Sequence, residues 1–67
     1  MELIDTPNPN AKKLESDAKQ SEVLEDLNKI EGVASVFFGP GFITVTKEEG
    51  TDWESINQDI INIFDKL

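Results

Sequence analysis

Cysteine and histidine are both missing from this 67-residue chain. Disulfide bonds and Cys/His zinc sites, which stabilise many small domains, are therefore excluded. Nucleophile–imidazole pairs of the Ser-His or Cys-His type and histidine acid–base catalysis are excluded for the same reason. The absence of cysteine also fits a reducing compartment, where disulfides are rare.

Positive charge is scarce as well, and arginine is absent. The sequence has 14 acidic residues against six lysines, which gives a formal net charge of −8. We expect no binding to nucleic acid, which depends on cationic contacts with phosphate, and none to anionic membrane surfaces. A charge of this size keeps a small domain soluble and leaves cationic partners as candidates.

Long hydrophobic runs are also absent. The longest one, Val36–Phe38, is far too short to cross a membrane. The acidic N-terminus resembles neither a signal peptide nor a basic transit peptide. The length predicts one small domain that spans residues 1–67.

The densest apolar sequence predicts a β-hairpin. Two runs rich in β-branched and aromatic residues, Val33–Phe38 and Phe42–Thr46, flank the link Gly39–Gly41. In the second run Ile43 and Val45 point to one face, and the residues between them point to the other, as a half-buried strand requires.

The first run of the hairpin leaves the position of one aromatic open. Phe37 must face opposite to both Val36 and Phe38. Either Phe37 alone or the other two therefore point to the second face of the sheet, where an exposed aromatic is a candidate contact site. We favour the alternative that the proline-rich segment near the N-terminus partly covers it.

Two amphipathic helices are predicted. The first spans residues 21–30, with Ser21 as its N-cap and Gly32 just after its end. The second runs to about residue 66, and Thr51 begins a capping box at its start. Apolar stripes at steps of three and four comprise Val23, Leu24, Leu27 and Ile30 in the first helix, and Trp53, Ile56, Ile60, Ile63, Phe64 and Leu67 in the second.

The N-terminal region adds one or two strands. Residues 1–5 predict a short strand, and Ala11–Glu15 predict a weaker one, because Lys12 and Lys13 interrupt its alternation. A polar linker follows. The predicted fold class is α+β, with a small, mainly antiparallel sheet of three or four strands and two helices packed on one face. The predicted order is β-(β)-α-β-β-α.

Two prolines stiffen the segment between the first two strands. Each fixes its own φ, removes a backbone donor and moves the preceding residue out of the α region. Such a loop loses little entropy on binding, so it is a candidate recognition loop. The alternative, which the residues alone favour, is a simple chain reversal between two strands.

Acidic residues gather around the turn before the second helix, namely Glu48, Glu49, Asp52 and Glu54. They miss the spacing of the EF-hand calcium loop, so we interpret them as a solvated turn rather than a cation site. We likewise interpret Lys12 and Lys13 as a solvated strand edge rather than a phosphate or carboxylate site. We therefore expect no catalytic residue, no metal and no cofactor.

Five stretches carry a resemblance to a known family. They are Thr6–Ala11, Ile30–Val33, Ser35–Pro40, Phe42–Lys47 and Asp52–Trp53. They resemble the N-terminal domain of Nfu-type iron–sulfur cluster scaffold proteins in order, and from the second stretch onward also closely in spacing. The resemblance covers nearly the whole chain.

The resemblance implies a role in iron–sulfur cluster biogenesis. In this family a separate C-terminal domain with a CxxC motif binds the cluster. This sequence has no cysteine, so it offers no thiolate ligand for a cluster. The resemblance implies a non-enzymatic accessory domain that binds proteins, either assembly components or apo-clients. We expect a cytoplasmic location, or the mitochondrial matrix in a eukaryote.

Three features depart from the family pattern. The segment Lys12–Gln20 is shorter than in the family, where it includes an extra strand, so we expect a reduced or rearranged sheet edge. Gly41 stands where the family usually has an acidic residue. Lys12 replaces a common apolar residue, and we expect the strand around it to be frayed.

The candidate partner-binding residues lie in the proline-rich loop and at the hairpin tip. They are Thr6, Pro7, Asn8, Pro9, Asn10, Phe38, Gly39, Pro40 and Phe42. We expect a monomer or a weak dimer. A second hypothesis is a stand-alone acidic structural or regulatory domain that keeps the fold but has no iron–sulfur role. Such a domain would self-associate through an exposed sheet edge.

Overall fold

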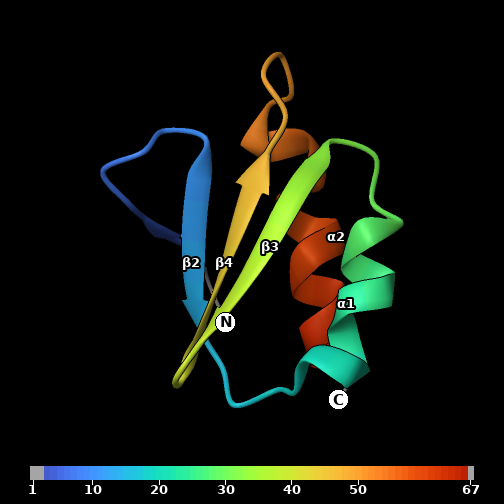
Figure 1. Cartoon of the computed structure of the whole chain (residues 1–67). Coiled ribbons are helices and arrows are strands. Elements are labelled where there is room, and N and C mark those ends of the chain that lie inside the picture. Colours follow the sequence, from blue (N-terminus) through green and yellow to red (C-terminus); the bar gives the residue numbers. More distant parts are fainter. Residues whose placement is uncertain (1–2, 67) are drawn as a thin grey trace.

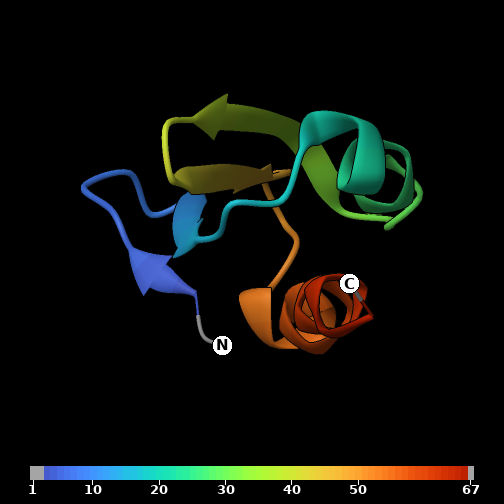
Figure 2. The same cartoon turned by 90° about the horizontal axis from the view of Figure 1, so that it is seen from below.

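Four strands form one antiparallel sheet, and two helices pack on one of its faces (Figure 1, Figure 2). The computed structural model describes residues 3–66. The elements are β1 (Ile4–Asp5), β2 (Ala11–Glu15), α1 (Gln20–Asn28), β3 (Val33–Gly39), β4 (Phe42–Lys47) and α2 (Trp53–Asp65). The predicted fold class and element order are confirmed. Residues 1 and 2 of the predicted first strand and the last residue of the second stripe lie outside the described residues.

Strand β4 lies inside the sheet, whose order is β1-β2-β4-β3. It pairs antiparallel with β2 on one side and with β3 on the other, so β2 and β3 run in the same direction. Helix α1 makes the crossover between them (Figure 2). The two edge strands are β1, with two residues, and β3, with seven.

The predicted hairpin is formed by β3 and β4. Gly39 pairs with Phe42, so the loop has two residues, Pro40 and Gly41, and β3 extends one residue further than predicted. Proline followed by a glycine with a φ of 77° suits a type II turn. The Phe42 ring lies over the Gly39 backbone, where a Cβ would overlap it.

The core lies between the sheet and the helices. Ile43 and Val45 of β4 point into it, as the predicted alternation requires. Both helical stripes contribute to one buried apolar cluster, which comprises Leu14, Val23, Leu27, Ile43, Val45, Ile56, Ile60 and Phe64. The helices therefore cover the inner face of the sheet and leave its outer face open.

Phe37 is the aromatic residue that points away from the core. Its exposed fraction is 62%, whereas Val36 and Phe38 pack against the core cluster. The expectation that the proline-rich loop covers this aromatic is wrong, because that loop follows β1 at the opposite edge of the sheet from β3. Phe37 instead neighbours Phe42, with the ring centroids 6.3 Å apart.

Strand β2 is fully paired rather than frayed. All five of its residues pair with β4, and Lys12 also pairs with Asp5 of β1. The expectation of fraying at Lys12 is wrong because its ammonium group has partners of its own. Nζ lies 3.2 Å from the Asp5 carboxylate and 5.5 Å from the centroid of the Trp53 ring.

Helix α1 does not begin at the predicted cap. It begins at Gln20 with Lys19 as the N-cap residue, and no side chain caps it. The Lys19 carbonyl oxygen accepts the Glu22 N–H at 2.9 Å, which places Ser21 inside the first turn. The helix ends at Asn28, two residues earlier than predicted.

Helix α2 begins at Trp53 with Asp52 as its N-cap residue, also without a side-chain cap. The capping box predicted at Thr51 is therefore wrong. The Thr51 side chain packs instead against Gly32, where a Cβ would lie 2.7 Å from Thr51 Cγ2. Gly32 has a φ of 105°, and its carbonyl oxygen accepts the Glu48 N–H at 2.8 Å. This contact joins the turn after α1 to the start of α2.

We predict that Leu27→Ala lowers the free energy of unfolding by about 2–5 kcal/mol, because Leu27 is fully buried in the core cluster. The matched control is Leu24→Ala on the same helix, which should cost clearly less because Leu24 is only partly buried. Urea unfolding followed by circular dichroism measures both losses. Equal losses would contradict the orientation of α1.

We also predict that Gly32→Ala is strongly destabilising. The positive φ alone costs roughly 1–2 kcal/mol for a residue with a Cβ, and the new Cβ also collides with Thr51. In a Thr51→Ala background the collision is removed, so the same change should cost less. Urea unfolding of the four proteins of this double-mutant cycle tests the contact. Additive losses would show that the two residues do not touch.

Candidate interaction site

The two predicted partner-binding segments lie at opposite ends of the sheet (Figure 1). The loop Thr6–Asn10 joins β1 to β2 just before Ala11, which pairs with Thr46. Phe42, beside the hairpin turn, pairs with Glu15 at the other end of β2. The structure therefore does not bring the two segments together, and they do not form one continuous site.

The hairpin tip offers a small surface. Phe38 packs against the core cluster, and Gly39 lies under the Phe42 ring. Pro40 is exposed in the turn. The exposed aromatic surface of the hairpin comes instead from Phe37, on the outer face of the sheet.

Hydrogen bonds within the loop Thr6–Asn10 fix its shape. The Thr6 hydroxyl oxygen lies 2.8 Å from the Ala11 carbonyl oxygen and 2.9 Å from that of Asn8, and it accepts the Asn8 N–H at 3.2 Å. The Asn8 side-chain oxygen accepts the Asn10 N–H at 2.9 Å, as in an Asx turn. Together with the two φ angles fixed by proline, these bonds hold the loop in one conformation.

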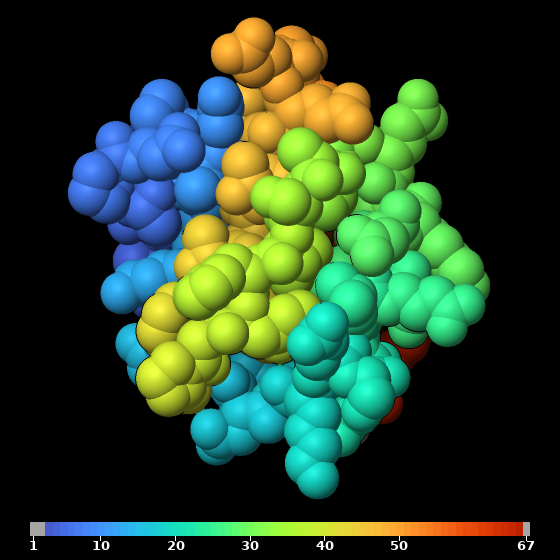
Figure 3. Space-filling view, viewed as in Figure 1, coloured from blue at the N-terminus to red at the C-terminus, as the bar shows by residue number. Residues whose placement is uncertain are grey.

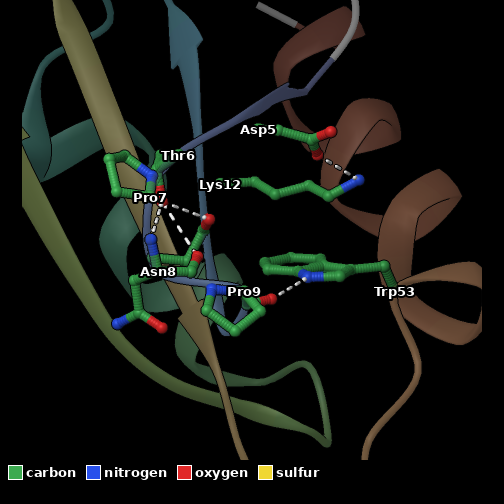
Figure 4. Close-up of a pocket in the computed structure, with 8 residues that line it drawn as sticks. Asp5, Thr6, Pro7, Asn8, Pro9, Lys12 and Trp53 are labelled. Atoms are coloured by element: carbon green, nitrogen blue, oxygen red, sulfur yellow. Dashed lines mark hydrogen bonds and ion pairs between the residues drawn. The ribbon is translucent and has the colours of Figure 1, made fainter.

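Two residues from later in the chain anchor the loop. Lys47 donates its backbone N–H to the Asn10 carbonyl oxygen at 2.7 Å and its Nζ to Asn10 Oδ1 at 3.1 Å. Trp53, the first residue of α2, donates its Nε1–H to the Pro9 carbonyl oxygen at 3.1 Å (Figure 4). The end of β4 and the start of α2 therefore both hold the loop in place.

A pocket of about 400 Å³ opens between the loop, β2 and Trp53 (Figure 4). Lys12 reaches across it from β2 toward the Asp5 carboxylate, and the Trp53 ring lies beside the Lys12 side chain. The lining residues are Asp5, Thr6, Pro7, Asn8, Pro9, Ala11, Lys12 and Trp53. Rings with a few convergent polar groups are features of ligand-binding pockets.

The acidic residues around the turn before α2 were considered as a possible cation site. Within residues 3–66, no three Asp, Glu, His or Cys side chains gather in a way that could hold a metal ion. No helix in the same range is long and apolar enough to cross a membrane. We take the pocket lined by the loop Thr6–Asn10, Lys12 and Trp53 as the candidate functional site, because it adjoins the anchored loop.

Trp53 and Lys12 line the pocket and Lys47 anchors its loop, although the sequence indicated none of these roles. Sequence patterns assigned Trp53 to an apolar helical stripe and Lys12 to a solvated edge. The indole hydrogen bond spans 44 residues and the Lys47 side-chain bond spans 37, so no local pattern reveals either. The one usable signal was a single tryptophan at a helix start, because an indole N–H usually finds an acceptor.

The fold is a small α+β domain with a pocket between the loop Thr6–Asn10, β2 and Trp53. Residues 13–67 match the family described as "Scaffold protein Nfu/NifU N terminal". The chain therefore belongs to the Nfu/NifU scaffold N-terminal family. The matched range includes the hairpin and both helices but not the loop Thr6–Asn10.

The human protein "NFU1 iron-sulfur cluster scaffold homolog, mitochondrial" is 44% identical over 73 residues, which cover 84% of this chain and 29% of the human protein. A NifU-like protein of Schizosaccharomyces pombe is 40% identical over 44 residues, 66% of this chain and 17% of that protein. The chain thus spans less than a third of either relative. The human alignment is longer than this whole chain, so the human protein has residues within the matched region that have no counterpart here.

Two solved structures share the fold. The solution NMR structure of the Staphylococcus aureus protein SAV1430 has a TM-score of 0.74 and 25% identity, and the match covers 96% of this chain and 87% of that one. The solution NMR structure of a Staphylococcus epidermidis protein has a TM-score of 0.63 and 29% identity, with 96% and 92% covered. The same fold therefore occurs in bacterial chains of similar length.

We predict that Trp53→Phe loosens the loop and lowers the free energy of unfolding by about 0.5–1.5 kcal/mol, the net value of one hydrogen bond. Phenylalanine keeps a ring beside Lys12 but cannot donate to the Pro9 carbonyl oxygen. Hydrogen exchange of the Asn10 and Ala11 amides should become faster, whereas exchange at the distant Phe37 amide should not change. Unchanged exchange in the loop would mean that the indole does not hold it.

Proposed function

We propose that this chain is a non-catalytic accessory domain of iron–sulfur cluster assembly that binds protein partners and does not itself hold a cluster. Membership of the Nfu/NifU scaffold N-terminal family supports the link to iron–sulfur assembly. The lack of cysteine supports the separation of this domain from cluster ligation, because thiolates are the usual cluster ligands.

The observation that carries the proposal is the anchored loop Thr6–Asn10. Lys47 and Trp53 hold its backbone, and its own side chains close two further turns. A loop that is already ordered loses little conformational entropy when a partner binds, so its contacts contribute more fully to affinity. Asn8 and the two prolines are exposed on it and are available for contact.

The partner, in this proposal, is an iron–sulfur assembly component or an apo-client with a cationic surface. The net charge of −8 favours such a surface and would accelerate association at low salt. The hairpin tip, with Phe38, Gly39, Pro40 and Phe42, is the second candidate contact, on a separate part of the domain. We further propose a monomer or weak dimer in the cytoplasm, or in the mitochondrial matrix if the source is a eukaryote.

The test is a titration of the ¹⁵N-labelled protein, followed by NMR, with an Nfu-type CxxC domain and separately with an apo-ferredoxin. We expect saturable shifts of the Thr6, Asn8, Asn10 and Lys12 amides and of the Trp53 indole N–H. Pro7→Ala should weaken binding roughly two- to five-fold, because the freer loop loses more entropy. Asn28→Ala, an exposed change at the end of α1, is the matched control and should have no effect.

Three results would contradict parts of this proposal. Shifts confined to the hairpin tip would exclude the loop as the contact. No shift with either partner would contradict the role in cluster assembly and favour a stand-alone acidic domain. A visible charge-transfer absorption after reconstitution of this chain with iron and sulfide would contradict the statement that it holds no cluster.

A further inference from the structure

Strand β3 leaves a long edge of the sheet open. At the other edge, β1 has only two residues and is followed by Pro7 and Pro9, and both short length and proline protect an edge from further strands. β3 has seven residues, and within residues 3–66 it pairs only with β4. Its sequence, VASVFFG, contains neither charge nor proline. This edge therefore lacks the common protections.

The views of the structure agree that the β3 edge is accessible. Figure 2 shows β3 as the last strand of the sheet, with no element on its outer side. Figure 3 shows β3 at the surface that faces the viewer, between β4 and α1. A bulge between Val33 and Ser35 limits the regular stretch at one end, and the turn at Pro40 limits it at the other.

Backbone groups of Val36 and Phe38 point outward from this edge. In a two-residue hairpin the pair that flanks the turn, here Gly39 and Phe42, exchanges both of its hydrogen bonds. Bonded and non-bonded pairs alternate along antiparallel strands, so Phe37 is bonded to β4 and its two neighbours are not. Their two N–H and two C=O groups are therefore free to pair with an added strand.

Helix α1, which lies next to β3 in the fold, carries exposed acidic residues. It packs against β3 and exposes Glu22, Glu25 and Asp26. Lys29 follows the helix directly. Its Nζ lies 3.8 Å from Glu25 Oε1 and offsets one of these charges. A lysine- or arginine-bearing strand gains from this field, whereas a second copy of the chain also carries −8 and is repelled.

We propose that β3 binds an extended, basic segment of a partner protein by strand addition. The main-chain groups of Val36 and Phe38 supply the hydrogen bonds, and the acidic residues of α1 select lysine or arginine. This inference rests on the proposed role in protein binding but uses the opposite edge of the sheet from the loop Thr6–Asn10. Strand addition at β3 and partner binding at the loop can therefore be refuted separately, because they predict NMR shifts at different amides.

The test uses the ¹⁵N-labelled protein and an end-capped synthetic peptide of seven residues in which lysine alternates with valine. We expect saturable shifts and slower solvent exchange at the Val36 and Phe38 amides. Exchange at the Phe37 amide, which already pairs with β4, should change little. The absence of these changes at millimolar peptide overturns the proposal, whatever the loop does with its own partners.

Matched peptides separate main-chain pairing from charge. A peptide with glutamate in place of lysine should bind at least about tenfold more weakly, and equal binding overturns the selection for a basic segment. Two further peptides carry N-methyl groups on alternate residues, in complementary sets. One of them should lose binding because its methyl groups face β3, and the other should retain it. Equal binding of both overturns strand addition.

Protein variants test the role of α1. Neutralising its three exposed acidic residues should weaken binding of the lysine peptide about three- to tenfold. The control removes the same charge from exposed positions of α2, with Glu54→Gln, Asp59→Asn and Asp65→Asn, and should weaken binding less. Equal effects overturn the assignment to α1. Concentration-dependent shifts of the Val36 and Phe38 amides without peptide would identify a second copy as the occupant and overturn the proposal.

Discussion

Burial of one apolar cluster between the inner sheet face and two helices holds this domain together. With neither cysteine nor histidine in the chain, no disulfide or Cys/His zinc site shares this task. Strand β4 is central to it, because Ile43 and Val45 lie in the cluster while the backbone pairs on both sides. A one-residue slip of β4 would turn both side chains outward, so its register fixes the positions of all other elements.

The candidate site depends on the same constraint. The loop Thr6–Asn10 is stiff by itself, yet its place on the sheet comes from Lys47 at the end of β4 and from Trp53 at the start of α2. Both anchors belong to elements that the core already holds. The two prolines could be recognised from the sequence, but the pocket could not. Pro9 and Trp53, which face each other across the pocket, are 44 residues apart in the sequence. Lys12, which lies over the Trp53 ring, was predicted from its neighbours to be part of a solvated or frayed strand.

The sequence predicts the fold correctly where local periodicity determines the secondary structure. The alternation in β4 and the apolar steps of three and four in the helices are encoded by neighbouring residues, and these elements formed as predicted. The helix starts differed for two reasons, a tertiary contact at α2 and a local backbone bond at α1. Thr51 packs against Gly32 instead of capping α2, and the Lys19 carbonyl begins α1 before Ser21 can cap it. The exposure of Phe37 followed from which face the helices cover.

The pairing of β2 with β4 sets the order in which the domain can assemble. Ala11 pairs with Thr46, whereas the hairpin joins neighbours such as Gly39 and Phe42. Contacts between distant residues form late, because closing a long loop costs entropy. We therefore expect the N-terminal strands to leave the ribosome first and to settle last. Until Trp53 has been synthesised, the proline-rich loop lacks its indole anchor, and the pocket between them cannot form.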